Sequence, residues 1–164
     1  MSKPLKMPEE VRFRLARVSD STAIAEMSRD LIEHGLPWRW QPSRIYTQIR
    51  CPENQVVVAA TKNEQIVGFA ITRFGEDEAH LFLLAVDPTY RRTGLGRQLV
   101  KWFEKSAQIA GIAQVYLEVR AKNQGARLFY RSLGYRELAL IPLYYSGREA
   151  AIRMVHDLHM SVHS

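Results

Sequence analysis

The feature that most constrains this chain is a strand-like run that passes through a short turn into a helix-like run. Residues 81–86 are apolar, the turn that follows ends in Gly94, and residues 95–110 carry apolar side chains at helical spacing. A further apolar, β-branched run follows at residues 115–119. A strand, a helix and a second strand in this order imply a parallel pair of strands within one sheet.

The turn before this helix has the composition of an anion-binding site. The first N–H groups of a helix are unpaired and carry partial positive charge. Gly94 and Gly96 allow the backbone to approach a phosphate closely and to adopt a positive φ. Charged donors that suit phosphate oxygens come from Arg91, Arg92 and Arg97. The sequence therefore predicts a pyrophosphate or a similar polyanion at the start of this helix.

Two familiar phosphate loops do not fit these residues. A dinucleotide fingerprint requires a third glycine three residues after Gly96, where the chain has Leu99. A nucleoside-triphosphate loop requires Lys and Ser or Thr after its second glycine, where the chain has Arg97 and Gln98. What remains is the pattern Arg-x-x-Gly-x-Gly.

Length and composition are those of a single-domain globular protein. The 164 residues suffice for one sizeable core, and we expect a flexible leader over residues 1–10 and one domain over residues 11–160. The net charge of +6 favours anionic ligands in a general way. The basic residues are scattered and no nucleic-acid motif is present, so we expect no nucleic-acid partner.

The sequence predicts no internal disulfide, no metal site and no membrane-spanning segment. The one cysteine, Cys51, cannot form an internal disulfide, and no histidines or cysteines have metal-ligand spacing. The five histidines are expected to be solvated or structural. The first ten residues lack a secretory core, and no apolar run has bilayer length. We expect a cytoplasmic protein, monomeric or homodimeric, with no metal and no membrane partner.

Periodicity and turn signals predict an α/β chain in the order β-αα-βββ-α-β-α-ββ. Ser19 or Asp20 can cap the first helix, and Gly35 ends it. A mixed central sheet with helices on both faces follows from the meander of three strands and the parallel pair. The expected strands cover residues 11–15, 56–60, 66–74, 79–86, 115–119, 135–145 and 150–158, and the expected helices include residues 44–50, 95–110 and 123–134.

A second informative segment covers residues 117–135. It contains Asn123-x-x-Ala-x-x-x-Tyr130 followed by Leu-Gly-Tyr. Together with Arg-x-x-Gly-x-Gly, in this order and one strand apart, it resembles the two signatures of the GNAT acyltransferases. That resemblance implies the GNAT acyltransferase fold with acetyl-CoA as co-substrate. Within the family, the chain is similar to the bacterial ribosomal-protein alanine N-acetyltransferases, in Ala-Val-Asp-Pro at residues 85–88 and Leu-Glu-Val-Arg-Ala at residues 117–121.

The resemblance implies a role for each matching residue. Glu118 resembles the general base of the group and Tyr130 its general acid, which gives a proton to the departing sulfur. Residues implied to bind the cofactor are Leu84, Ala85, Val86, Arg91, Arg92, Thr93, Gly94, Leu95, Gly96, Arg97 and Asn123. Residues expected to meet the acceptor are Trp38, Tyr144 and Tyr145.

Each assignment has an ordinary structural alternative. Glu118 alternates with apolar neighbours and could face solvent, Tyr130 could be a core tyrosine, and Asn123 could serve only as a helix cap. Trp38 and Trp40 could form a local hydrophobic plug or line the acceptor groove. Two departures from the group, at residues 39–41 and at Leu83, fall where such enzymes meet the acceptor.

Four functions remain open on these grounds. The first is acetyl transfer from acetyl-CoA to the N-terminal α-amine of a protein or peptide. The second changes the acceptor to a small amine such as a polyamine, amino acid or aminoglycoside. The third is a CoA-binding regulatory module without turnover, which would need neither Glu118 nor Tyr130. The fourth, nucleic-acid binding, rests only on the basic charge.

Overall fold

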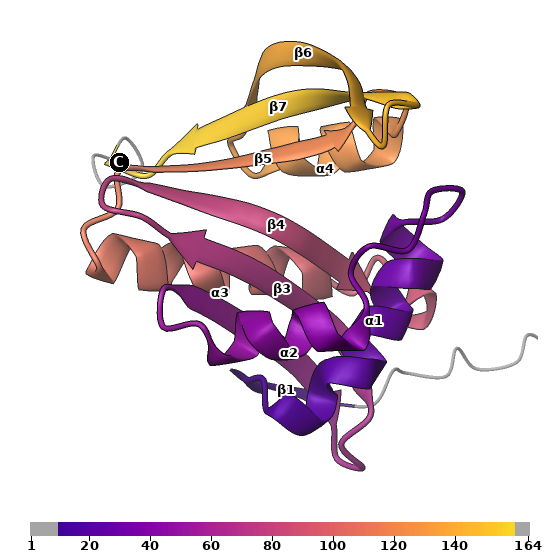
Figure 1. Cartoon of the computed structure of the whole chain (residues 1–164). Helices are drawn as coiled ribbons and strands as arrows, with labels where there is room; N and C mark the ends of the chain where they lie inside the picture. The colour runs from indigo at the N-terminus through magenta and orange to yellow at the C-terminus, as the bar shows by residue number, and fades with distance from the viewer. Residues whose placement is uncertain (1–9, 160–164) are drawn as a thin grey trace, which may run out of the picture.

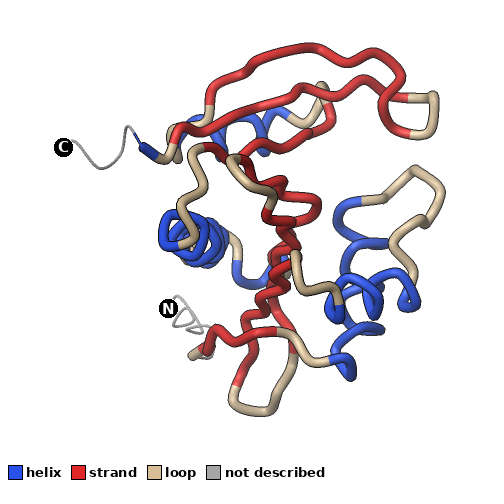
Figure 2. The backbone as a smooth tube through the Cα atoms, turned by 60° about the vertical axis from the view of Figure 1, so that its left-hand side comes forward, coloured by secondary structure: helices blue, strands red, loops and turns tan. Residues whose placement is uncertain are grey.

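The computed structural model describes residues 10–159, which form one seven-stranded sheet in the order β1-β2-β3-β4-β5-β7-β6. All neighbours are antiparallel except β4 and β5, which are parallel. The predicted mixed sheet with helices on both faces is confirmed (Figure 2). Apart from Glu10, the leader expected at residues 1–10 lies outside the described residues, as does residue 160 at the end of the expected domain.

The elements follow the expected order. The strands are β1 (Val11–Leu15), β2 (Asn54–Thr61), β3 (Ile66–Phe74), β4 (Glu78–Val86), β5 (Gln114–Arg120), β6 (Arg136–Tyr145) and β7 (Glu149–Asp157). The α-helices are α1 (Ser21–Met27), α2 (Pro42–Arg50), α3 (Leu95–Ile109) and α4 (Gln124–Ser132).

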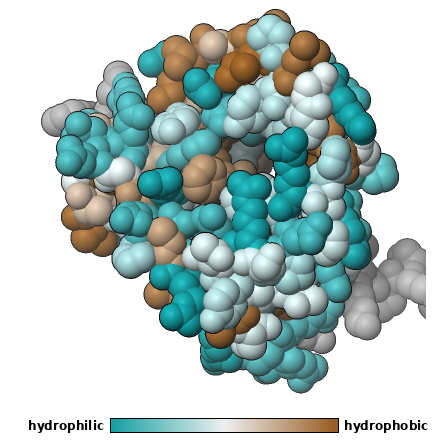
Figure 3. Space-filling view, in the orientation of Figure 1, coloured by the Kyte–Doolittle hydropathy of each residue, from teal (hydrophilic) through white to brown (hydrophobic). Residues whose placement is uncertain are grey.

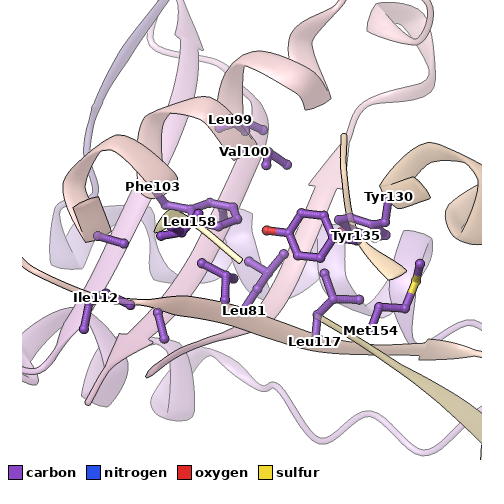
Figure 4. Packing of buried hydrophobic residues seen from close by; sticks show 14 of the residues in the cluster. Leu81, Leu99, Val100, Phe103, Ile112, Leu117, Tyr130, Tyr135, Met154 and Leu158 are labelled. Atoms are coloured by element: carbon purple, nitrogen blue, oxygen red, sulfur yellow. The ribbon is translucent and has the colours of Figure 1, made fainter. Parts of the chain in front are cut away.

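Two apolar layers hold the helices on opposite faces of the sheet. On one face, Ile24 of α1 and Ile45 of α2 are fully buried against Phe69 of β3. On the other face, α3 buries Leu99 and Phe103 in a second cluster with residues of β4, β5, α4 and β7. Figure 4 shows this second cluster, with the rings of Tyr130 and Tyr135 at its α4 end. Burying side chains of this size contributes roughly 1.5–3 kcal/mol each, so both helix layers are fixed to the sheet.

An irregularity in β4 changes which face its side chains occupy. The register between β3 and β4 shifts so that Ile71 pairs with Leu83 and Thr72 pairs with Leu81, which leaves Phe82 as the extra residue of a bulge. Leu81 therefore packs in the α3 layer, while Leu83 packs in the α1 and α2 layer. Residues 79, 81, 83 and 85 are all buried, so the alternation in the sequence conceals this change of face.

The parallel strands separate beyond this bulge. Pairing between β4 and β5 ends at Leu81 and Leu117. In Figure 1 the two strands lie side by side at one end and diverge toward the other. Within the described residues, the β5-facing edge of β4 therefore has no strand partner after Leu81, and the sheet is open there.

Two local predictions concern the first helix and Pro142. The first helix expected after residue 20 is confirmed, since α1 continues without a break into a π-helical turn (Ser28–Ile32), and a 3₁₀ turn (Val18–Asp20) precedes it. The Asp20 side chain accepts from the Arg17 N–H at 2.7 Å and so caps the 3₁₀ turn instead of α1. Pro142 predicts a bulge or an exposed edge, and both are confirmed, since β6 is an edge strand with a register shift between Ile141 and Tyr145.

Candidate active site

Three cavities adjoin one another at the opening between β4 and β5. The large cavity, of about 700 Å³, lies against the start of α3 and the side of α4. The outer cavity, of about 400 Å³, lies between the loop that precedes α2 and the end of β6. The junction cavity, of about 140 Å³, shares Tyr130 with the large cavity and Glu118 with the outer cavity. Figure 3 shows a hollow on this face, below the apolar side chains of the upper part of the molecule.

The large cavity gathers most of the residues that the sequence assigns to the cofactor. Its lining includes Leu84, Ala85, Val86, Arg91, Arg92, Gly94, Leu95, Gly96, Arg97 and Asn123. Thr93 is not part of this lining, and its hydroxyl donates to the Tyr90 carbonyl. Asn123 is both the cap of α4, accepting from the Ala126 N–H at 3.1 Å, and a wall residue of the cavity.

The loop before α3 presents several unpaired donors to this cavity. Arg92 and Gly94 have φ angles of 64° and 83°, so the backbone turns sharply into the helix. The first helix-type bond runs from the Gln98 N–H to the Gly94 carbonyl. Within residues 10–159 the N–H groups of residues 94–97 therefore have no acceptor, and Arg91, Arg92 and Arg97 form no salt bridge. This cluster of donors suits a polyanion.

Gly96 packs closely against Phe129 of α4 in the wall of the large cavity. A Cβ atom at this position would lie 3.2 Å from Cζ of Phe129, which is tighter than ordinary contact. The helix start and α4 can approach each other this closely only because residue 96 has no side chain.

Glu118 lies at the inner end of the outer cavity, with three donors around its carboxylate. Its Oε1 is 2.8 Å from Nε2 of His80 and accepts from the Tyr144 hydroxyl at 2.8 Å. Its Oε2 accepts from Nε of Arg153 at 3.3 Å. The side chain is only 3% exposed, so the solvent-facing alternative for Glu118 is wrong.

These partners keep the Glu118 carboxylate ionised. Burial acts to raise its pKa, but the hydrogen bonds from His80 and Tyr144 and the charge of Arg153 outweigh burial and hold the pKa below its usual range. Burial and the adjacent carboxylate raise the pKa of Tyr144 to about 12, so its phenol remains a donor at neutral pH. The site therefore holds a charged carboxylate beside a hydrogen-bonded imidazole.

His80 is the site residue that sequence reasoning misses. The sequence places it among the solvated or structural histidines, yet its ring stacks on Tyr116 at 4.3 Å and contacts Glu118. Its register partner on β5 is Tyr116, two residues before Glu118, just before the strands separate. The signal that could have identified it is a lone histidine in an apolar strand that is parallel to the Glu118 strand.

Tyr130 lies between the large cavity and the junction cavity. Its side chain is 7% exposed, and its ring packs edge-on against Phe129 and Tyr135. Burial raises its pKa above the usual tyrosine range, so the hydroxyl stays protonated. Within residues 10–159 this hydroxyl has no hydrogen-bond partner, in contrast to Tyr135, which donates to Glu104 at 2.7 Å. Tyr130 is thus a core residue and a wall of the cavities at the same time.

The acceptor-side assignments need one correction. Trp38 turns back onto α1, where its indole N–H donates to the Ala25 carbonyl at 3.2 Å, and it does not line the outer cavity. Trp40 takes that place, with its ring against Phe82 at 5.9 Å. Tyr144 and Tyr145 both line the outer cavity.

Neither a cluster of metal-ligating side chains nor a membrane-spanning helix is found in the part of the chain that the structure describes. No group of three or more His, Cys, Asp or Glu side chains within residues 10–159 is arranged to hold a metal ion. Among the described helices, none is both long and apolar enough to span a bilayer.

The sequence of this chain is similar to those of known acetyltransferases. Residues 25–135 match the model of the family described as "Acetyltransferase (GNAT) family". The ribosomal protein bS18-alanine N-acetyltransferase of Escherichia coli (strain K12) is 44% identical over 103 residues, which are 61% of this chain and 70% of that protein.

Two solved structures extend the likeness to most of the chain. The crystal structure of the ribosomal-protein-S18-alanine N-acetyltransferase from Escherichia coli has a TM-score of 0.77 at 32% identity, covering 91% of this chain and 94% of that one. The structure of Ard1 from Thermoplasma volcanium has a TM-score of 0.79 at 27% identity, covering 90% of this chain and 97% of that one.

Proposed function

Because the chain belongs to the acetyltransferase (GNAT) family, we propose that the large cavity binds acetyl-CoA and that the outer cavity admits the N-terminal α-amine of a protein or peptide. The observation that carries this proposal is the junction cavity, which is lined by both Tyr130, shared with the large cavity, and Glu118, shared with the outer cavity. Two substrates that enter from opposite sides would meet between a proton donor and a proton acceptor.

The large cavity fits the donor substrate on three counts. Its unpaired N–H groups at residues 94–97 and the arginines beside them suit the pyrophosphate. Gly96 packs so closely against Phe129 that a larger residue would displace this part of the cavity wall. The β4 edge beyond Leu81 has backbone groups without a strand partner, which suit an amide-bearing arm. When bound, acetyl-CoA supplies the acetyl group as a thioester.

The residues at the junction divide the proton transfers between them. The ionised Glu118 accepts the proton that the amine loses, directly or through a water molecule. Tyr130, kept protonated by burial, gives a proton to the departing sulfur. Backbone N–H groups of β4 near Leu84 bind the acyl oxygen as it gains negative charge, and one such donor typically lowers the barrier by about 3 kcal/mol.

An α-amine is the acceptor that this site favours. Its ordinary pKa is about 8, against about 10 for a lysine side chain, so more of it is neutral near pH 7. The Escherichia coli relatives described above are named as alanine N-acetyltransferases of a ribosomal protein, which supports a protein amine as the acceptor. Leu83 and residues 39–41 differ from the residues usual in those enzymes at positions that meet the acceptor. The proposal therefore names the acceptor by its class, an N-terminal α-amine.

A thiol-release assay tests the proposal. With acetyl-CoA present, we expect release with short peptides that have a free α-amine, and none when the same peptides are capped at the N-terminus. Release with polyamines, amino acids or aminoglycosides but not with peptides would contradict the proposed acceptor. Binding of CoA without release from any amine would instead support a regulatory module.

The strained loop offers a test of the donor site. Gly94→Val should lower the affinity for acetyl-CoA by about tenfold or more, because a β-branched residue at φ 83° is strained by at least roughly 1–2 kcal/mol and would displace the donors around it. Calorimetric titration with CoA measures the effect directly.

A matched glycine separates this effect from general destabilisation. Gly111 follows α3 with φ 81° and is outside the cavity lining. A Cβ atom added at Gly111 would have nothing within 4 Å, and the same holds at Gly94. Gly111→Val should lower the melting temperature while leaving CoA affinity unchanged. An equal loss of affinity in both variants would show that the loop makes no specific contribution.

A further inference from the structure

The outer cavity has opposite charges at its two ends. The ionised Glu118 lies at the inner end, and Arg39 and Arg44 form part of the outer wall. Both arginines are exposed, and neither has an ion-pair partner within residues 10–159. Figure 3 shows strongly hydrophilic side chains around the hollow on this face. A ligand that enters here therefore meets positive charge first and negative charge last.

The segment that carries the arginines is held in place by a buried carboxylate. Glu33 is 8% exposed, and its Oε1 accepts from the backbone N–H groups of Arg39 at 2.7 Å and Trp40 at 3.2 Å. Its Oε2 accepts from the Ser28 hydroxyl at 2.8 Å. The negative charge of Glu33 is thus committed to its own loop, and the backbone of residues 39 and 40 has a fixed position.

Arg44 is positioned by an aromatic ring. Its guanidinium carbon lies 3.7 Å from the centroid of the Trp40 ring, and Trp40 in turn packs against Phe82 of β4. A guanidinium that stacks on an aromatic face keeps N–H donors at its edge for a carboxylate. Holding the group in advance reduces the entropy lost when a ligand binds.

We propose that Arg39 and Arg44 select acceptor peptides with acidic side chains close behind the amino terminus. This inference rests on the proposed function and names its substrate class. An extended peptide whose α-amine reaches Glu118 directs its following residues outward along the same cavity. Acidic side chains there meet the two guanidinium groups, whereas lysine or arginine side chains meet like charge.

The experiment compares matched alanine-initiated peptides with the full chain. One peptide has neutral residues at positions 2–4, one series has a single glutamate at each of these positions, and another has a single lysine. At low salt, the best glutamate peptide should exceed the neutral peptide in kcat/KM by about fivefold, and the matching lysine peptide should fall below it. The differences should shrink as ionic strength rises.

Variants connect the preference to the two arginines. The double variant R39E/R44E should reverse the order of glutamate and lysine peptides, and R39Q/R44Q should abolish the preference while conserving the size of the side chains. The control R50E/R136E makes the same change in net charge at exposed positions outside the outer cavity and should leave the preference intact.

The outcomes separate this inference from the proposed function. Equal kcat/KM for glutamate, neutral and lysine peptides at low salt would overturn charge selection while leaving α-amine acetylation in place. An equal shift in R50E/R136E would overturn the assignment to Arg39 and Arg44. Failure of every peptide, the neutral one included, would overturn the proposed function and the selection together.

Discussion

Replacing Glu118 with glutamine should lower kcat/KM for the acceptor amine by about a hundredfold or more, while the affinity for acetyl-CoA stays essentially unchanged. The carboxylate lies at the inner end of the outer cavity and is held ionised by His80, Tyr144 and Arg153. Glutamine has a similar shape but cannot take up a proton at neutral pH. Steady-state kinetics with a peptide acceptor, together with CoA titration, measure both quantities.

The matched control is a half-buried glutamate with similar partners. Glu104 of α3 accepts from the Tyr135 hydroxyl at 2.7 Å and contacts Nδ1 of His156 at 2.8 Å, but it lines none of the three cavities. Glu104→Gln should lower the melting temperature and leave kcat/KM close to that of the parent. If Glu118→Gln kept full activity, Glu118 would be a structural ion-pair partner and the general base would lie elsewhere.

The pH profile should reflect the acceptor more than the enzyme. Because the pKa of Glu118 is lowered, this carboxylate is already ionised throughout the neutral range. The rise of kcat/KM should then follow the loss of the α-amine proton, near pH 8 for an ordinary amino terminus. A peptide with a less basic amino terminus should shift this rise to lower pH.

The donor side of the site could be predicted from sequence because its residues are contiguous. The turn at residues 91–97 needs only local geometry, namely a glycine with positive φ and the unpaired start of a helix. Asn123 caps α4 and Tyr130 lies two turns further along the same helix, so local spacing determines that they share a face. In such contiguous segments, local geometry and helical spacing are enough to predict which side chains lie close together.

The acceptor side could not be predicted in the same way because it depends on register. The bulge at Phe82 moves Leu83 to the other face of the sheet, although the alternation of buried residues continues unbroken. His80 approaches Glu118 only because β4 and β5 are paired up to Leu81 and separate after it. The sequence leaves both Trp38 and Trp40 open as groove residues, and only the folded loop, whose backbone Glu33 binds, distinguishes them.

Replacing Tyr130 with phenylalanine should lower kcat by about a hundredfold while acetyl-CoA affinity and stability change little. The hydroxyl has no hydrogen-bond partner within residues 10–159, so its removal breaks no bond that stabilises the fold. The ring contacts with Phe129 and Tyr135 do not involve the oxygen. Thermal unfolding, CoA titration and kinetics on one preparation measure the three quantities.

A neighbouring tyrosine gives the opposite expectation. Tyr135 is also buried, but its hydroxyl donates to Glu104, away from the cavities. Tyr135→Phe should therefore cost about 1 kcal/mol of stability or more, since it leaves a carboxylate with one fewer donor, and should leave kcat unchanged. Tyr130→Phe is thus expected to lose activity and keep its stability, whereas Tyr135→Phe is expected to lose stability and keep its activity. Full activity in Tyr130→Phe would leave Tyr130 as a core residue only, and the proton for the departing sulfur would have to come from another donor or from water.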